Sequence, residues 1–168
     1  PFDRNRYPRE HMDAGTYQWG KDWVEQNVIF LAPELPTVDQ LIDRMRAAKV
    51  QRGVQLFILD NWMSMSHHVK NGDMLAYIDE QLTKLGNFAA KEHVLVILVT
   101  HGTKPATGQK LEDAMGVYGS AHSAAFGNKP AVVLEVARYF PVDGVTVIRV
   151  NKVRSRYAGR EGHMYLEF

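Results

Sequence analysis

The stretch that decides the fold is Val54-Gln55-Leu56-Phe57-Ile58-Leu59-Asp60-Asn61, an apolar run that ends abruptly in an acid. A second apolar run, Val94-Leu95-Val96-Ile97-Leu98-Val99, ends in the polar pair Thr100-His101. Continuous β-rich runs of this kind are typical of strands buried on both faces of a parallel sheet. In open α/β sheets the ligand binds at the carboxyl ends of such strands. The pattern therefore predicts that Asp60 and His101 meet a nucleotide phosphate and its magnesium, although each alone could equally be a turn cap or a polar loop residue.

Two helix signals flank the first run. Thr37-Val38-Asp39-Gln40 is a capping box, with Gln40 at the third helical position. Asp73 can cap a longer helix. Each of these helices has an apolar face at helical spacing, which we expect to be buried. These faces consist of Leu41, Ile42, Met45 and Ala48 in the first helix and Leu75, Ile78, Leu82, Leu85 and Phe88 in the second.

Further apolar runs predict strands over 27–31, 131–136, 145–150 and 163–168, the last two as an antiparallel pair. Strands and helices that alternate and then give way to terminal strands indicate an α/β fold with a mostly parallel sheet flanked by helices. Residues 1–26 show no clear period. They are predicted to be a surface arm or the truncated edge of something larger.

Composition excludes several classes of site. At 168 residues the chain is predicted to be one domain, and its net charge of +1 requires any nucleic-acid site to be a local patch. Because there is no cysteine, disulfides and thiolate metal sites are excluded. No apolar run approaches the roughly 20 residues of a membrane span, and the N-terminus lacks the order of a signal peptide. We expect a soluble intracellular protein without a membrane partner.

Over residues 27–168 the chain resembles the C-terminal RecA-like motor domain of ring-shaped replicative DNA helicases, the DnaB-like, phage primase-helicase and Twinkle-like proteins. Residues 56–61 resemble the Walker B strand of this family, and residues 96–101 resemble the strand that ends in its γ-phosphate sensor. The segment Asn151-Lys152-Val153-Arg154 resembles the Lys-x-Arg that reaches the neighbouring subunit's ATP site. The resemblance implies a RecA-like core over 27–168 that uses ATP and Mg²⁺.

Phosphoryl transfer depends mainly on positioning and on neutralising charge at the γ-phosphate. The resemblance implies that Asp60 holds the Mg²⁺ shell and that His101 hydrogen-bonds the γ-phosphate or the attacking water. Arg154 would stabilise transition-state charge in a neighbouring subunit, with Lys152 beside it. The two side chains lie two residues apart on one strand face, so they can point at one neighbour. Arg156 is a second candidate for the arginine finger, and spacing favours Arg154.

The resemblance also implies a surface for single-stranded DNA inside a ring of identical subunits. Residues 104–110 resemble the basic loop that holds the DNA, where Lys104 and Lys110 would contact phosphates. Gly119 and Ser120 resemble the Gly-Ser element of the next DNA-facing loop. A primase domain or protein is a further possible partner. The implied location is the cytoplasm of a bacterial or phage-infected cell, or the mitochondrial matrix.

The chain departs from this family in three ways. It contains no Gly-x-x-x-x-Gly-Lys-Ser/Thr, the phosphate-binding P-loop, and no convincing equivalent of the catalytic Glu that follows it. Residues 123–130 do not reproduce the family's Gln-x-x-Asp pattern. We therefore expect a partial domain that is inactive alone. Two alternatives stay open: a non-catalytic fragment for DNA binding or ring assembly, and the core of a RecA-type recombinase.

The adjacent pair His67-His68 follows the predicted Walker B strand and could suggest a metal site. Adjacent residues of a strand point to opposite faces, which favours exposed loop histidines instead. Trp62 and Met63-Ser64-Met65 are expected to pack beneath the strand tip.

Overall fold

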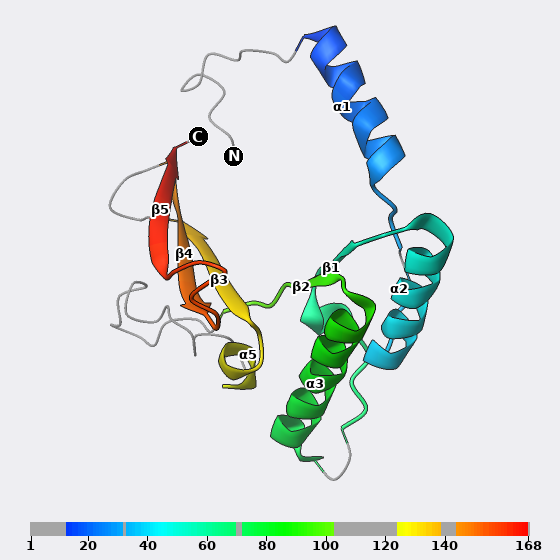
Figure 1. Cartoon of the computed structure of the whole chain (residues 1–168), viewed down its shortest axis with the longest axis vertical. Helices are drawn as coiled ribbons and strands as arrows, with labels where there is room; N and C mark the ends of the chain where they lie inside the picture. Colours follow the sequence, from blue (N-terminus) through cyan, green and yellow to red (C-terminus); the bar gives the residue numbers. More distant parts are fainter. Residues whose placement is uncertain (1–12, 32, 70–71, 103–123, 139–143, 168) are drawn as a thin grey trace. The chain divides into compact units, whose positions relative to one another are not determined.

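The computed structural model describes residues 13–31, 33–69, 72–102, 124–138 and 144–167 (Figure 1). The chain divides into two compact units, residues 1–34 and residues 35–168. Its elements, in chain order, are α1 (Ala14–Asn27), α2 (Val38–Arg52), β1 (Leu56–Leu59), the 3₁₀-helix η1 (Trp62–Ser64), α3 (Met74–Glu92), β2 (Leu95–Leu98), α5 (Ala125–Asn128), β3 (Val132–Arg138), β4 (Val145–Val153) and β5 (Gly162–Glu167).

Helix α1 lies in the first unit, and the aperiodic N-terminal sequence did not indicate it. Asp13 begins the helix, because its carboxylate accepts hydrogen bonds from the first free backbone N–H groups. The helix ends at Asn27, and residues 28–31 join no strand in the described part of the chain. The predicted strand over 27–31 is therefore wrong. An apolar run becomes a strand only where a second strand takes up its backbone hydrogen bonds.

Helix α2 begins and ends as its local sequence predicts. The Thr37 hydroxyl accepts from the backbone N–H of Gln40, and the Gln40 side chain accepts from the backbone N–H of Thr37, so the predicted capping box is confirmed. Gly53 ends the helix with φ of 70°, a left-handed conformation that glycine adopts without the steric cost of a side chain. Strand β1 follows three residues later.

Strands β1 and β2 form a parallel pair in which Leu56 is aligned with Leu95. On β1, Phe57 is buried, whereas Leu56 and Ile58 are 48% and 61% exposed. The prediction that these strands are buried on both faces is therefore wrong for the described residues. The reason is that α2 and α3 pack against one face, and no described element covers the other.

Helix α3 supplies four of the twelve residues of the core cluster, more than any other element. The Asp73 side chain caps it by accepting from the backbone N–H of Ala76, as the sequence predicts. Ile78 is fully buried at 0% exposure, whereas Leu75 in the first turn is exposed, contrary to the predicted stripe. Leu75 instead lines an open hollow between α3 and residues 124–128. The core cluster consists of Val38, Leu41, Met45, Phe57, Leu59, Trp62, Met65, Ile78, Leu82, Leu85, Phe88 and Phe126.

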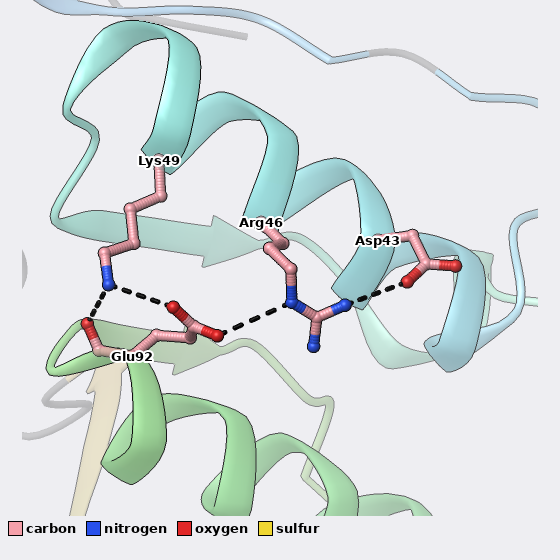
Figure 2. Close-up of polar contacts among 4 residues, drawn as sticks. All are labelled: Asp43, Arg46, Lys49 and Glu92. Carbon is pink, nitrogen blue, oxygen red and sulfur yellow. Dashed lines mark hydrogen bonds and ion pairs between the residues drawn. The ribbon is translucent and has the colours of Figure 1, made fainter.

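Ion pairs between Lys49 and Arg46 of α2 and Glu92 of α3 hold α2 against the C-terminal end of α3 (Figure 2). Lys49 Nζ donates to the Glu92 carboxylate at 3.0 Å and to the Glu92 main-chain carbonyl at 2.6 Å. Arg46 lies between the carboxylates of Glu92, at 3.5 Å, and Asp43, at 3.1 Å. The hydrogen bond from Lys49 lowers the pKa of Glu92 below its ordinary value. A cation at a helix C-terminus also interacts favourably with the helix dipole.

Strands β3, β4 and β5 form an antiparallel sheet in the order β3-β4-β5. The predicted antiparallel pairing of the last two strands is confirmed, with Val145 aligned with Glu167. The third strand, β3, also pairs with β4, and its register shifts between Val133 and Leu134.

Among the described residues, none of the helices combines the length and the apolar composition that a membrane span requires.

Candidate functional site

The tips of β1 and β2 are tied together by backbone hydrogen bonds that continue beyond the strands. Val99 N–H donates to the Leu59 carbonyl at 3.0 Å, and Trp62 N–H donates to the Val99 carbonyl at 2.9 Å. Asp60 follows β1 directly, and His101 lies three residues after β2. The two residues that the sequence singled out therefore lie at the same, carboxyl-terminal edge of the parallel pair.

Asn61 links the two tips through its side chain. Its amide nitrogen Nδ2 lies 3.2 Å from His101 Nε2. Its amide oxygen Oδ1 accepts from the backbone N–H of Ser64 at 3.2 Å and from the Ser64 hydroxyl at 3.3 Å, which makes Asn61 the N-cap of η1. Sequence reasoning missed Asn61. The available signal was the Asn itself, a preferred N-cap and turn residue, directly after the strand that ends in an acid.

Asp60 is the residue at this edge whose chemistry suits a magnesium ion. Its carboxylate is exposed. Mg²⁺ keeps several waters and usually needs only one or two protein carboxylates in addition to substrate phosphates. In the described ranges, no group of three or more His, Cys, Asp or Glu side chains could hold a metal by itself. A single Asp therefore fits a site that is completed by water and nucleotide.

Lys152 and Arg154 both reach the last carbonyls of α5. Lys152 Nζ donates to the carbonyls of Gly127 and Asn128, both at 2.7 Å. Arg154 Nη2 donates to the carbonyls of Asn128 at 2.8 Å and Lys129 at 3.0 Å. Desolvation lowers the pKa of Lys152, and the charge of Arg154 lowers it further. The two cations thus point at one cluster of acceptors.

Helix α5 is itself fixed to the core at two points. Lys129 Nζ forms an ion pair with Asp79 at 2.9 Å and a hydrogen bond to the Thr83 hydroxyl at 2.9 Å, both on α3. The ring of Phe126 is 6% exposed and meets the ring of Trp62 edge-on at 5.5 Å. The segment that holds Lys152 and Arg154 is therefore anchored beside the segment that follows Asp60.

Trp62 and Met65 are buried beneath the strand tip as predicted, at 3% and 7% exposure. Met63 and Ser64 are exposed, so the prediction is wrong for these two residues.

His67 differs from the expectation of an exposed loop histidine. Its ring stacks on Trp62 at 4.5 Å, its Nε2 lies 3.0 Å from the Trp62 carbonyl, and its Nδ1 lies 3.4 Å from the Tyr77 hydroxyl. Packing against the tryptophan half-buries the ring. His68 is exposed, as expected.

Four predicted DNA-binding residues lie outside the described part of the chain. Lys104, Lys110, Gly119 and Ser120 all fall within residues 103–123 and lie outside the described residues. Arg156, the second candidate arginine finger, is exposed in the turn after β4.

One segment comes close to the P-loop pattern. Gly15 and Gly20-Lys21 have the spacing Gly-x-x-x-x-Gly-Lys, but Asp22 stands where the pattern requires Ser or Thr. All four residues lie within α1, where the N–H of Gly15 bonds to the Asp13 carboxylate and later N–H groups bond to carbonyls of the preceding turn. The segment is therefore helical and does not form the loop that surrounds a phosphate.

Comparison with curated proteins finds one related sequence of known family. No protein-family model matches the chain. The chain is 29% identical over 178 aligned residues to the Twinkle homolog protein, chloroplastic/mitochondrial, of Arabidopsis thaliana. The match covers 99% of the chain and 24% of that protein, so the chain spans about a quarter of the length of this relative.

Solved structures give the fold. The chain is similar to an ATPase domain with a TM-score of 0.77 and 15% identity, over 98% of the chain and 60% of that structure. It is also similar to a DnaB-like replicative helicase, described together with its interactions with primase, with a TM-score of 0.78 and 14% identity over 99% of the chain and 42% of that structure. The chain therefore has the RecA-like α/β fold of replicative-helicase motor domains, of which it covers part, and the resemblance expected from its sequence is confirmed.

Proposed function

We propose that the chain is the portion of a replicative DNA helicase motor that runs from the Walker B strand to the arginine finger. The observation that carries the proposal is the meeting of the β1 and β2 tips, where Asn61 hydrogen-bonds His101 directly beside Asp60. In a RecA-like fold this edge of the sheet is where a ligand binds. Similarity to a Twinkle homolog and to a DnaB-like helicase supports the same assignment.

In the proposed mechanism ATP and Mg²⁺ bind at this edge. Mg²⁺ would neutralise charge on the β- and γ-phosphates, and Asp60 would hold its water shell through an exposed carboxylate. His101 would hydrogen-bond the γ-phosphate or the attacking water. The P-loop that surrounds the phosphates would come from another part of a longer protein.

Arg154 would act on the ATP of a neighbouring subunit, with Lys152 beside it. The structure has both side chains on the carbonyl cluster at the end of α5. Phosphate oxygens carry full charge and are stronger acceptors than carbonyls, so a neighbour's nucleotide can compete for the two cations. The planar guanidinium of Arg154 can bind two phosphate oxygens at once, which lysine cannot.

The proposed helicase motor binds DNA, identical subunits and a primase. Lys104 and Lys110 would bind phosphates of single-stranded DNA, with Gly119 and Ser120 in the neighbouring loop. Identical subunits would form a ring, and a primase domain or protein is a further partner, as it is for the DnaB-like neighbour. Because the sequence relative is chloroplastic/mitochondrial, an organelle is one location, beside a bacterial or phage-infected cytoplasm.

The first experiment measures ATP hydrolysis, with and without single-stranded DNA, by this chain and by a longer protein that joins it to a P-loop. We expect turnover by the longer protein only, and its loss in Asp60→Ala. Steady turnover by the chain alone that Asp60→Ala abolishes would contradict our account of the P-loop. A longer protein that binds DNA without hydrolysing ATP would favour the non-catalytic alternative, which the missing P-loop supports.

The second experiment tests whether Arg154 acts in a neighbouring subunit. In the longer protein, Arg154→Ala should lower turnover by about 10³-fold or more while nucleotide binding persists. Mixing this variant with a P-loop variant should restore some active interfaces. Arg156→Ala is the matched control. If Arg156→Ala is the damaging change and mixing restores nothing, the assignment of Arg154 is wrong.

The third experiment tests the DNA loop by titrating labelled oligonucleotides at several salt concentrations. Each phosphate contact that is lost should reduce the slope of log affinity against log salt by about 0.7. Replacing Lys104 and Lys110 with alanine should weaken binding to every sequence alike and leave basal hydrolysis intact. An unchanged slope and affinity would exclude both lysines from the DNA site.

A further inference from the structure

The hydrogen bonds of Asn61 determine which end of its amide faces His101. The backbone N–H of Ser64 is an unambiguous donor, and it lies 3.2 Å from the Asn61 Oδ1 atom. The Ser64 hydroxyl donates to the same Oδ1 atom, at 3.3 Å. Turning the amide over would place two Nδ2 hydrogens against a backbone N–H and leave that donor unpaired. The amide NH₂ group must therefore face the imidazole.

An NH₂ group can only donate, so His101 Nε2, 3.2 Å away, must accept. A neutral imidazole has one protonated and one unprotonated nitrogen, and an acceptor Nε2 requires the proton on Nδ1. Within the described residues, Nδ1 of His101 has no hydrogen-bond partner. The ring thus has one fixed nitrogen and one N–H that can donate to a ligand.

We infer that Asn61 is a positioning residue: it holds His101 in the tautomer whose Nδ1–H is the donor for a phosphate oxygen. The inference rests on the proposed function for the identity of the ligand, but the tautomer itself follows from the geometry alone. Asn61 can hold the ring still because its own side chain is fixed at its other end as the cap of η1. A donor fixed before the nucleotide arrives requires no reorientation during the reaction.

The direct test is the protonation of His101, read from the ¹⁵N chemical shifts of its ring nitrogens in the isotope-labelled chain at a pH where the ring is neutral. A His101→Gln variant assigns the signals. In the wild-type chain we expect a protonated Nδ1 and an unprotonated Nε2. Averaged shifts, or a protonated Nε2, would overturn the inference.

Asn61→Asp separates capping from donation. Aspartate is as good an N-cap as asparagine, so it can still accept from Ser64, but its second oxygen can only accept. The proton of His101 should then move to Nε2. Ser64→Ala is the matched control, because it keeps the backbone N–H that orients the amide, and the Nδ1–H form should persist. Asn61→Ser, a second capping residue that is too short to reach the ring, should give averaged shifts. A wild-type pattern in both Asn61 variants would refute the assignment.

The second test measures hydrolysis by the longer protein that contains a P-loop. Loss of an outer partner that orients a functional histidine typically costs about 10- to 100-fold. We expect Asn61→Asp to lower kcat within that range with little change in KM for ATP, and to add little to the loss in His101→Ala. Unchanged kcat would overturn the positioning role. If the wild-type protein hydrolyses no ATP, the proposed function fails, whereas the shifts still decide the tautomer.

Discussion

Replacing Phe126 with alanine should remove the main apolar contact that holds α5 on the core. A helix of four residues is not stable by itself, so its position depends on what it packs against. Phe126 is 6% exposed, and its ring meets Trp62 edge-on at 5.5 Å. Deleting a buried phenylalanine costs about 3–5 kcal/mol, of which the aromatic pair contributes about 0.5–1.5 kcal/mol. We expect about 3 kcal/mol, the low end, because α5 is short and can shift to fill the cavity.

The assay is urea unfolding of the chain followed by far-UV circular dichroism. Phe126→Leu, which keeps most of the volume, should cost less than about 1.5 kcal/mol. Tyr157→Ala, at an aromatic that is 96% exposed, is the matched control and should change the free energy of unfolding by less than about 0.5 kcal/mol. For a chain of this length, each kcal/mol also corresponds to a Tm shift of about 2–4 °C.

The reasoning would be refuted if Phe126→Ala cost no more than Tyr157→Ala at an unchanged slope with urea. That result would mean that α5 is held by its polar contacts, those of Lys129 with Asp79 and Thr83 and those of its carbonyls with Lys152 and Arg154. The outcome bears on function, because the carbonyls at the end of α5 accept the hydrogen bonds of Arg154.

Three further predictions concern stability. Lys49 lowers the pKa of Glu92, so the ion pair stabilises the fold at pH values above the ordinary pKa of a glutamate, and this stabilisation is lost as the pH falls through the lowered pKa. Glu92→Gln should therefore lower the free energy of unfolding at pH 7 and leave it equal to that of the wild type near pH 2, as acid titration of unfolding will show. Gly53→Ala should cost about 1 kcal/mol in urea unfolding because φ is 70°, and a cost near zero would contradict the left-handed cap. Phe57→Ala should cost about 3–5 kcal/mol, whereas Ile58→Thr should cost less than about 1 kcal/mol, and the reverse order would show that the buried face of β1 is misassigned.

Local signals in the sequence were enough to predict the two long helices α2 and α3, the five strands of the described residues and the edge where the candidate site lies, but not α1 or α5. The capping box at Thr37 and the cap at Asp73 act on backbone groups within three residues, so the two helices begin where the sequence says. The polar ends of the two apolar runs predicted that Asp60 and His101 share one edge, because parallel strands have their carboxyl ends on the same side.

Contacts between distant segments decided the rest. Whether residues 28–31 form a strand depends on the presence of a partner strand, which the local sequence does not indicate. Whether Ile58 is buried depends on which element covers its face of β1, and the local sequence does not indicate that either. The carbonyls that receive Arg154 lie more than 20 residues away along the chain. Asn61 reads as a simple turn residue until the fold brings His101, 40 residues later, onto its amide. The sequence by itself determined α2, α3, the five described strands and the edge of the sheet, and the tertiary structure decided which side chains meet there, because hydrogen bonds and burial depend on distances in space between residues far apart in sequence.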